Sequence, residues 1–333
     1  MKKKRLEELR SQRWLAPDNT RSFAHRQRLQ QMGLRREEFM SRPVIAIVNT
    51  WSDLSPCHAQ REAHRLGDQP ETNAFCALLD RSTPPLGTWL MAGTPSNAEA
   101  LGHAGFDWLL IDMEHGPIEF REAWQMLQAV ECTPAMPIVR VPGSDDPTLV
   151  KRALDLGART LMFPYVQSAE QARRIVASAK YPPLGHRGFA GVHRGSRYGA
   201  FSDYSRRANG LTTCIVQLET PEAIGSLEEI AAVEGVDALF IGPGDLSAAV
   251  GCIGNLQDER VQALMRTAAQ RARAAGIPIG TLGPTPEMVQ DFVEMGYDYV
   301  AVGSDLVFMM QQAKSVVARM KGLTGSTPMA VAY

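Results

Sequence analysis

The chain has 333 residues, of which 44% are hydrophobic and 21% are charged, a composition typical of a globular protein with a substantial buried core. This composition excludes a disordered, collagen-like or coiled-coil chain. The sequence has no apolar run of about 18 residues to span a bilayer, and no apolar stretch follows the charged start MKKKRLEELR, so we expect a cytoplasmic protein.

The five cysteines are an odd number, are widely spaced and form no CxxC pair, which predicts reduced thiols rather than a disulfide framework or a zinc ribbon. They are Cys57, Cys76, Cys132, Cys214 and Cys252.

Charge is distributed unevenly along the chain. Residues 1–70 contain 14 Lys and Arg against 8 Asp and Glu, whereas the remainder contains 21 against 28. A basic leader is typical of nucleic-acid binding or of an organelle presequence, but acidic residues are interspersed and no nucleic-acid motif accompanies them. We therefore interpret the leader as a solvated, partly helical arm and expect neither nucleic-acid nor membrane partners.

From residue 86 onward, short apolar runs alternate with amphipathic stretches of helical period, a pattern that predicts parallel strands with helical crossovers. Eight such pairs over about 240 residues predict a (β/α)8 barrel. A doubly wound sheet is the alternative, which the lack of GxGxxG after the first strand disfavours. The expected strands are 86–93, 108–115, 136–142, 160–166, 214–220, 237–243, 277–283 and 297–304.

Capping residues and glycines mark the expected helix ends. Helices are expected to start at Thr94, Ser168, Thr220, Asp258 and Thr285. Glycines precede several strands, namely Gly105, Gly157, Gly235, Gly276 and Gly296.

Polar residues at the carboxyl ends of the strands are the candidates for chemistry, because the loops of a barrel converge at that face. Besides the apolar Leu282, they are Asp112, Glu114, His115, Arg140, Gln217, Glu219, Asp245, Ser304 and Asp305.

Glu219 and Asp245 follow neighbouring strands, so their carboxylates are expected to reach one point and to bind Mg²⁺ or Mn²⁺ with waters. Co²⁺ would suit the same ligands. The alternative is structural, with Glu219 next to the helix cap at Thr220 and Asp245 in a turn.

His115 lies three residues after Asp112, so a carboxylate is expected to hold one ring nitrogen and leave the other as a general base. A structural histidine is the alternative. Glu114 has two interpretations, as a residue that supports the site or as a surface residue.

Arg140 interrupts an apolar strand, so it must pair with a carboxylate or face an anionic ligand. Its forked donors suit an enolate oxygen, and the backbone amides of Gly244 and Asp245 suit a carboxylate. A cation, a metal site and a base together indicate carbanion chemistry next to a carbonyl.

The segment from Tyr181 to Thr213 is much longer than an ordinary loop between a helix and a strand. We interpret it as a lid or a subunit-contact segment. A phosphate cradle is the weaker interpretation, because no glycine-lysine-serine pattern is present.

In this order, the motifs IDMEHGP, IVRVPG, YPPLGHRGFAG with SRYG, IVQLET and IGPGDLS resemble those of the metal-dependent class II pyruvate aldolases that act on hydroxy-oxo-heptanedioate and dehydro-deoxy-glucarate. The resemblance covers residues 73–323. It implies a barrel of the phosphoenolpyruvate/pyruvate-binding type and a homo-oligomer, a hexamer in the family, with sites near the subunit interfaces.

The resemblance also implies roles for single residues. Glu219 and Asp245 are expected to bind the metal, and Arg140 to contact the oxo oxygen of pyruvate. His115 with Asp112 would serve the aldol hydroxyl. The remaining substrate-binding positions are Gln217, Gly244 and Asp245 at pyruvate and Leu282 on the aldehyde side.

Residues 21–60 resemble the amino terminus of the dihydroxy-acid and sugar-acid dehydratases, whose iron–sulfur cluster is held partly by a cysteine at the position of Cys57. A cluster needs further thiolates, so none is expected here. We interpret residues 1–72 as a nonfunctional leader, 73–323 as the aldolase barrel and 324–333 as a tail. Because such dehydratases make 2-oxo-3-deoxy acids, the leader favours a sugar-acid substrate such as 2-dehydro-3-deoxyglucarate.

Two other functions remain open. An acyl-CoA lyase of the citrate-lyase-beta type would use the same apparatus, and a non-catalytic scaffold would use none of it. A Schiff-base aldolase needs a buried amine, and no lysine is expected at a strand end near Glu219 and Asp245.

Overall fold

The computed structural model describes residues 73–80 and 82–322. The dehydratase-like leader with Cys57 and the tail at 324–333 lie outside the described residues.

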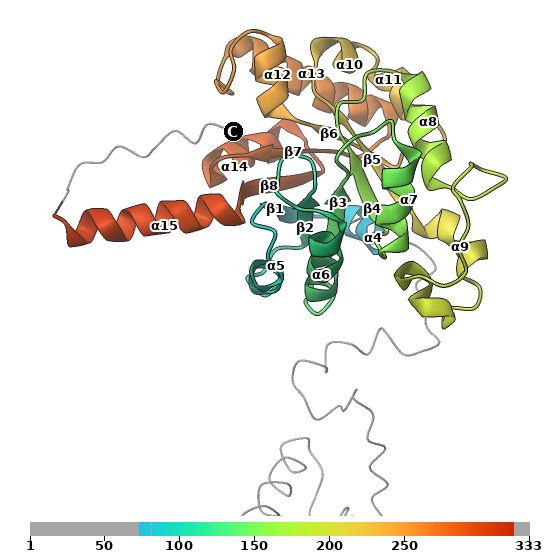
Figure 1. Cartoon of the computed structure of the whole chain (residues 1–333). Coiled ribbons are helices and arrows are strands. Elements are labelled where there is room, and N and C mark those ends of the chain that lie inside the picture. Colours follow the sequence, from blue (N-terminus) through green and yellow to red (C-terminus); the bar gives the residue numbers. More distant parts are fainter. Residues whose placement is uncertain (1–72, 81, 323–333) are drawn as a thin grey trace, which may run out of the picture. The chain divides into compact units, whose positions relative to one another are not determined.

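Eight parallel strands close into a barrel in which each strand pairs with the next one along the chain and β8 pairs with β1 (Figure 1). The (β/α)8 expectation is therefore confirmed, and the doubly wound alternative is wrong because the sheet has no open edge. The strands are β1 Leu86–Leu90, β2 Trp108–Asp112, β3 Met136–Arg140, β4 Thr160–Phe163, β5 Thr213–Leu218, β6 Ala238–Ile241, β7 Ile279–Gly283 and β8 Tyr299–Ser304.

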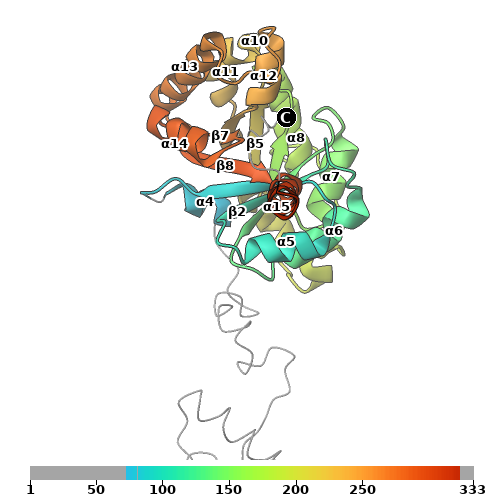
Figure 2. The same ribbon diagram turned by 90° about the vertical axis from the view of Figure 1, so that its left-hand side faces the viewer.

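Helices follow the strands around the outside of the barrel, with one short helix before β1 (Figure 2). The α-helices are α4 Ala74–Leu79, α5 Pro95–Gly102, α6 Phe120–Val130, α7 Pro147–Asp155, α8 Ala169–Ala179, α9 Tyr204–Leu211, α10 Pro221–Gly225, α11 Leu227–Ala231, α12 Pro243–Ala249, α13 Glu259–Ala275, α14 Pro286–Met295 and α15 Asp305–Met320. A 3-10 helix, η3, spans Arg194–Gly199. No helix in the described part of the chain is long and apolar enough to cross a membrane.

The five expected capping residues all precede helices, and every one except Thr94 accepts a hydrogen bond from a backbone N–H of its helix. Two of the expected glycines, Gly276 and Gly296, end α13 and α14 with positive φ of 70° and 99°. Glycine is the residue that adopts this left-handed conformation without a steric cost.

Aromatic side chains fill the barrel interior at its amino-terminal end. Trp108 and Tyr299, from the starts of β2 and β8, lie with ring centroids 6.0 Å apart, and Phe75 of α4 packs its edge on both. A Cβ atom at Gly87 would overlap the Trp108 ring, so this glycine makes room for it. Because this end is filled by apolar groups, polar chemistry is confined to the other end.

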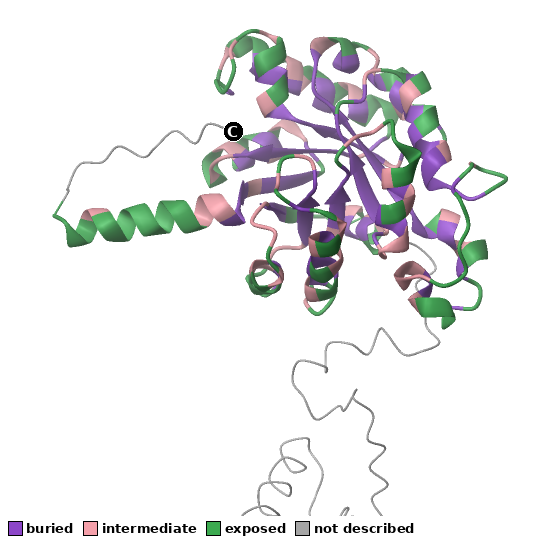
Figure 3. Cartoon of the chain, viewed as in Figure 1, coloured by how far each residue is buried: buried purple, intermediate pink, exposed green. Residues whose placement is uncertain are grey.

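A second, larger core lies between the strands and the surrounding helices, and Figure 3 shows the buried strands inside a shell of half-exposed helices. The long segment after α8 adds a small apolar cluster of its own. Its members are Tyr181, Phe201, Tyr204, Ala208 and Leu211. This segment is thus a packed substructure, and Arg187 within it is buried against Asp155 at 2.7 Å.

The last helix, α15, departs from the barrel arrangement. It projects away from the strands in Figure 1 and is seen end-on in Figure 2. Asp305 is its buried residue, and its oxygens accept hydrogen bonds from the backbone N–H groups of Met91 and Ala92. The start of α15 is therefore fixed to the loop after β1, whereas the rest of the helix is largely exposed (Figure 3).

Candidate active site

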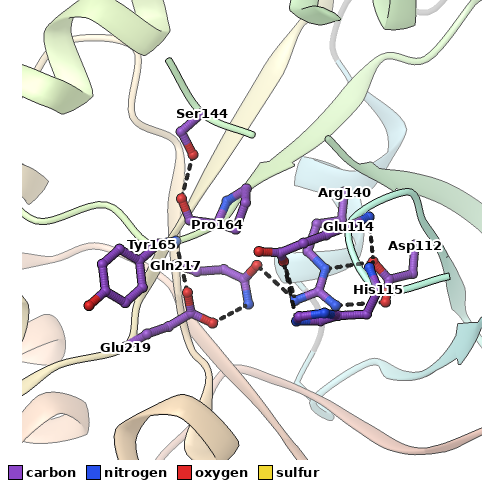
Figure 4. A network of polar contacts seen from close by, with 9 residues as sticks. All are labelled: Asp112, Glu114, His115, Arg140, Ser144, Pro164, Tyr165, Gln217 and Glu219. Atoms are coloured by element: carbon purple, nitrogen blue, oxygen red, sulfur yellow. Dashed lines mark hydrogen bonds and ion pairs between the residues drawn. The ribbon is translucent and has the colours of Figure 1, made fainter. Parts of the chain in front are cut away.

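Polar side chains from β2, β3 and β5 form one connected network at the carboxyl end of the barrel (Figure 4). Its core consists of Asp112, Arg140, Gln217 and Glu219, all of which are buried. The structure therefore brings these four residues together, as expected from the sequence.

Arg140 is the centre of the network. Its Nε and Nη2 donate to the two oxygens of Asp112 at 2.9 and 2.6 Å, while Nη1 contacts Glu114 Oε2 at 2.9 Å and Gln217 Oε1 at 3.4 Å. Three guanidinium N–H groups thus donate hydrogen bonds to side chains, and the contact with Glu114 is an ion pair.

Burial alone would lower the pKa of Arg140, but hydrogen bonding and attraction to Asp112, together with Glu114 and Glu219, hold its pKa above the ordinary value. The barrel interior also supports the cation from below, because the guanidinium carbon lies 5.9 Å from the centre of the Trp89 ring. Arg140 is thus a permanent, fixed positive charge.

The expected bond between the Asp112 carboxylate and the His115 ring is wrong. Asp112 and Arg140 are register partners on β2 and β3, so the guanidinium takes both carboxylate oxygens. Asp112 Oδ1 also accepts the backbone N–H groups of Glu114 and His115 at 3.0 and 3.3 Å. Asp112 therefore shapes the loop that carries His115 and does not touch its ring.

Glu114 is the carboxylate that lies near the His115 ring, with 3.9 Å between Oε2 and Nε2. The His115 side chain is 58% exposed, which leaves it accessible to a substrate. Burial is the main cause that raises the pKa of Glu114, against the attraction of Arg140. The sequence identified Glu114 as polar and well placed, but its contacts with Arg140 and His115 depend on how the loop after β2 turns.

Glu219 is held through both of its oxygens. Gln217 Nε2 donates to Oε1 at 3.3 Å, and the backbone N–H of Tyr165 donates to Oε2 at 2.8 Å. A Cβ atom at Gly242 would overlap this carboxylate, so the glycine is required for the side chain to fit. Tyr165, whose contact was not expected from the sequence, follows β4 in the same way as the other candidates follow their strands.

Asp245 and Gly244 lie in the first turn of α12, directly after β6, and Asp245 is exposed. Burial is the largest cause that raises the pKa of Glu219 to about 7, and the negative charge of Asp245 is the next. The two carboxylates are therefore close enough for the charge of Asp245 to act on Glu219.

The other expected positions are arranged around this centre. Leu282 is buried near the end of β7 and belongs to the apolar cluster inside the barrel, together with Trp89 and Phe240. Ser304 and Asp305 cap and anchor α15. The polar network thus adjoins the apolar cluster inside the barrel, to which Leu282 belongs.

Residues 86–311 match the family model described as HpcH/HpaI aldolase/citrate lyase. The chain is 54% identical to the 2-dehydro-3,6-dideoxy-6-sulfogluconate aldolase of Pseudomonas putida over 77% of this chain and 100% of that protein. It is 41% identical to the 4-hydroxy-2-oxo-heptane-1,7-dioate aldolase of Salmonella dublin over 77% of this chain and 98% of that protein.

Among solved structures, an HpcH/HpaI aldolase/citrate lyase family protein from Burkholderia cenocepacia superposes with a TM-score of 0.73 at 37% identity, covering 75% of this chain and all of the other. The expected family and the expected enzyme class are both confirmed. The chain belongs to the HpcH/HpaI aldolase/citrate lyase family and is a carbon–carbon lyase of the aldolase type.

Proposed function

We propose that the barrel cleaves a 4-hydroxy-2-oxo acid to pyruvate and an aldehyde, with Glu219 and Asp245 as the protein ligands of a divalent cation. The observation that carries this proposal is the network that brings the fixed cation of Arg140 beside the buried carboxylate of Glu219. A fixed cation near a buried carboxylate that could bind a metal ion suits the formation of an enolate from a 2-oxo acid.

The donor set fits a hard cation such as Mg²⁺ or Mn²⁺. Glu219 is held at both oxygens, and its pKa is raised first by burial and then by the negative charge of Asp245, both of which a bound cation would offset. No group of three or more His, Cys, Asp or Glu side chains suited to a metal exists within 73–80 and 82–322, so the substrate and waters would supply the other ligands. When bound, such an ion supplies positive charge that stabilises the enolate oxygen.

Each of the other site residues has its own role in the reaction. Arg140 donates to the 2-oxo oxygen and holds the negative charge that develops there during cleavage. The backbone amide of Gly244 and the side chain of Gln217 face the pyruvate part, and Leu282 lines the aldehyde side. Asp112 positions Arg140 through its two hydrogen bonds.

His115 accepts the proton of the C4 hydroxyl, directly or through a water, and Glu114 beside it favours the resulting imidazolium. The C3–C4 bond breaks, its electron pair forms the enolate of pyruvate, and the C4 carbon leaves as the aldehyde. Water protonates the enolate at C3, and the His115 imidazolium returns its proton to the solvent, which completes the reaction.

The substrate class that we propose is a six-carbon 2-oxo-3-deoxy acid with an acidic group at its far end. The 54% identical relative is named for a sulfonated substrate of this type, and 2-dehydro-3-deoxyglucarate has a carboxylate in the same place. Rates of pyruvate release from the two compounds, compared under identical conditions, decide between a sulfonate and a carboxylate.

Proton exchange of the pyruvate methyl group in D₂O, followed by NMR with Mg²⁺ or Mn²⁺ and again with EDTA, tests the enolate chemistry without a choice of aldehyde. We expect exchange that depends on the metal. Failure to exchange in a folded, metal-loaded protein would overturn the aldolase mechanism.

We further propose that the protein is a homo-oligomer in which α15 packs against a second copy of the chain. Apolar residues recur along α15 at alternating intervals of four and three, the spacing of a helix stripe that contacts a partner. They are Leu306, Met310, Ala313, Val317 and Met320. Met320 is 82% exposed in the single chain, and contact with an apolar partner surface would bury it.

The catalytic unit that we propose is residues 73–323, with 1–72 as a nonfunctional leader and 324–333 as a tail. The family match at 86–311 falls inside this unit and supports it.

A further inference from the structure

Tyr165 has an unusual backbone conformation next to the site. Its φ is +54°, and only Arg197 and Tyr198 share a positive φ among the non-glycine residues of the described chain. This left-handed region is unfavourable for an aromatic residue, because the Cβ atom crowds the following carbonyl oxygen. A residue held there points to a requirement for the direction of its peptide groups.

The left-handed turn directs three consecutive residues to three different partners. Pro164 accepts a hydrogen bond from Ser144 Oγ, and the N–H of Tyr165 donates to Glu219 Oε2 at 2.8 Å (Figure 4). The N–H of Val166 donates to the Gln217 carbonyl at 2.9 Å. The turn therefore joins the loop after β3 to Gln217 of β5 and to Glu219, which follows this strand.

The bond to Glu219 matters because this carboxylate has few other constraints. Gln217 Nε2 is its other hydrogen-bond donor, at the longer distance of 3.3 Å, and Gly242 bounds the Oε1 oxygen. Without the Tyr165 N–H, the Gln217 bond is the remaining hydrogen bond that opposes rotation of the carboxylate about its last bond. Tyr165 is 55% exposed, and none of the hydrogen bonds in the described structure involves its hydroxyl.

We propose that Tyr165 is a positioning residue that acts through its backbone: the left-handed conformation aims the N–H at Glu219 and fixes the orientation of the carboxylate for the cation. This inference rests on the proposed role of Glu219 as a metal ligand. Any residue that tolerates the left-handed region is therefore expected to replace Tyr165 without loss of this role.

The test is a substitution series ordered by tolerance of positive φ, with the dissociation constant of Mn²⁺ measured by isothermal titration calorimetry on the full chain. Tyr165→Gly and Tyr165→Asn should bind Mn²⁺ within about twofold of the wild type, since both residues adopt this conformation readily. Tyr165→Val should bind about tenfold more weakly or worse, as expected for the loss of one hydrogen bond to a charged group.

Tyr198 provides a matched control. It is also an exposed tyrosine with a positive φ, of 56°, but its N–H donates to the carbonyl of His193 in the segment before α9. Tyr198→Val should lower the melting temperature as Tyr165→Val does, and should leave the Mn²⁺ dissociation constant unchanged. If Tyr165→Val does not fold, Tyr165→Ala, which lacks the branched Cβ, takes its place with the same expected direction.

The outcomes separate the two proposals. If the wild type binds Mn²⁺ and the 165 series has one common dissociation constant, the positioning role is wrong and the metal site stands. If Gly, Asn and Val variants are all equally weakened, the phenol ring is what matters, and the backbone role is again wrong. If Mn²⁺ does not bind to the folded wild type, the metal site is wrong and the positioning role fails with it.

Discussion

Asp112 and Arg140 are register partners on adjacent strands, and their side chains meet in two hydrogen bonds of 2.9 and 2.6 Å at the carboxyl end of the barrel. Both side chains are buried, with exposures of 0% and 7%. The pair fixes the orientation of the Arg140 guanidinium, and the other contacts of the network depend on that orientation.

Arg140→Ala should slow pyruvate methyl exchange by about 10²–10³-fold, because a donor to the developing enolate oxygen is lost. Arg140→Lys should recover little of the rate, since an ammonium group cannot reproduce the fork held by Asp112. Methyl exchange rates at saturating Mn²⁺ provide the measurement. A lysine variant as fast as the wild type would mean that charge alone is sufficient.

Asp112→Ala leaves the buried guanidinium without its partner and should lower the free energy of unfolding by about 3–5 kcal/mol. Denaturant unfolding measures this loss. Asp305→Ala is a useful comparison, because Asp305 is also a buried aspartate but pairs with backbone N–H groups and Asn97 instead of a cation. Only the Asp112 variant should lose methyl exchange as well as stability.

The raised pKa of Glu219 predicts how the stability of the metal-free protein changes with pH. Its pKa rises from the ordinary value of 4.5 to about 7 in the folded chain, so the folded state keeps a proton that the unfolded state has released. The free energy of unfolding should therefore be highest below pH 4.5 with respect to this group and fall as pH rises toward 7, by about 3 kcal/mol at most.

Glu219→Gln should remove this component, because the amide does not titrate. Denaturant unfolding at several pH values in EDTA, wild type against Glu219→Gln, isolates the effect from all other titrating groups. Mn²⁺ should restore the stability of the wild type at high pH and have little effect on the variant. The same pH slope in both proteins would contradict the assignment.

His115→Ala should slow cleavage of the 4-hydroxy-2-oxo acid by about 10²–10⁴-fold, the range for a lost general base, and should slow methyl exchange of pyruvate less. Glu114→Gln should give a smaller loss in cleavage, because His115 stays in place. His103→Ala changes an exposed histidine at the end of α5 and should leave both rates unchanged. Equal losses of cleavage and exchange in His115→Ala would mean that His115 serves both steps.

Met310→Asp together with Val317→Asp places two charges on the exposed stripe of α15 and should convert the oligomer into a smaller species, by size-exclusion chromatography with light scattering. Ser315→Asp adds a charge on the opposite side of the same helix and should leave the mass unchanged. A monomeric wild type would overturn the proposed contact.

Removal of residues 1–72 should leave methyl exchange and its metal dependence unchanged, since the network lies within Asp112–Asp245. Comparison of the truncated and full chains at equal metal concentration measures this. Activity gained on truncation would instead identify the leader as an inhibitor, and activity lost would give it a function.

The alternation of apolar runs and amphipathic stretches was sufficient to locate all eight strands. Each observed strand is shorter than its apolar run. In β1 to β6 the last residues, such as Met113 after Asp112, lie beyond the strand end, whereas β7 and β8 end as expected and start two residues later. The same pattern identified Arg140, Gln217 and Glu219, because parallel strands deliver their carboxyl ends to one face whatever the details of packing.

The partners of these side chains were decided by tertiary structure. The spacing of Asp112 and His115 suggested a pair, but the strand register places Arg140 opposite Asp112, and a buried carboxylate binds the nearest forked cation before a neighbour on its own loop. The contact of Tyr165 with Glu219 could not be predicted from the sequence either, because a tyrosine does not by itself indicate a positive φ. Sequence periodicity determines which residues reach a face, whereas register and loop conformation determine which atoms meet there.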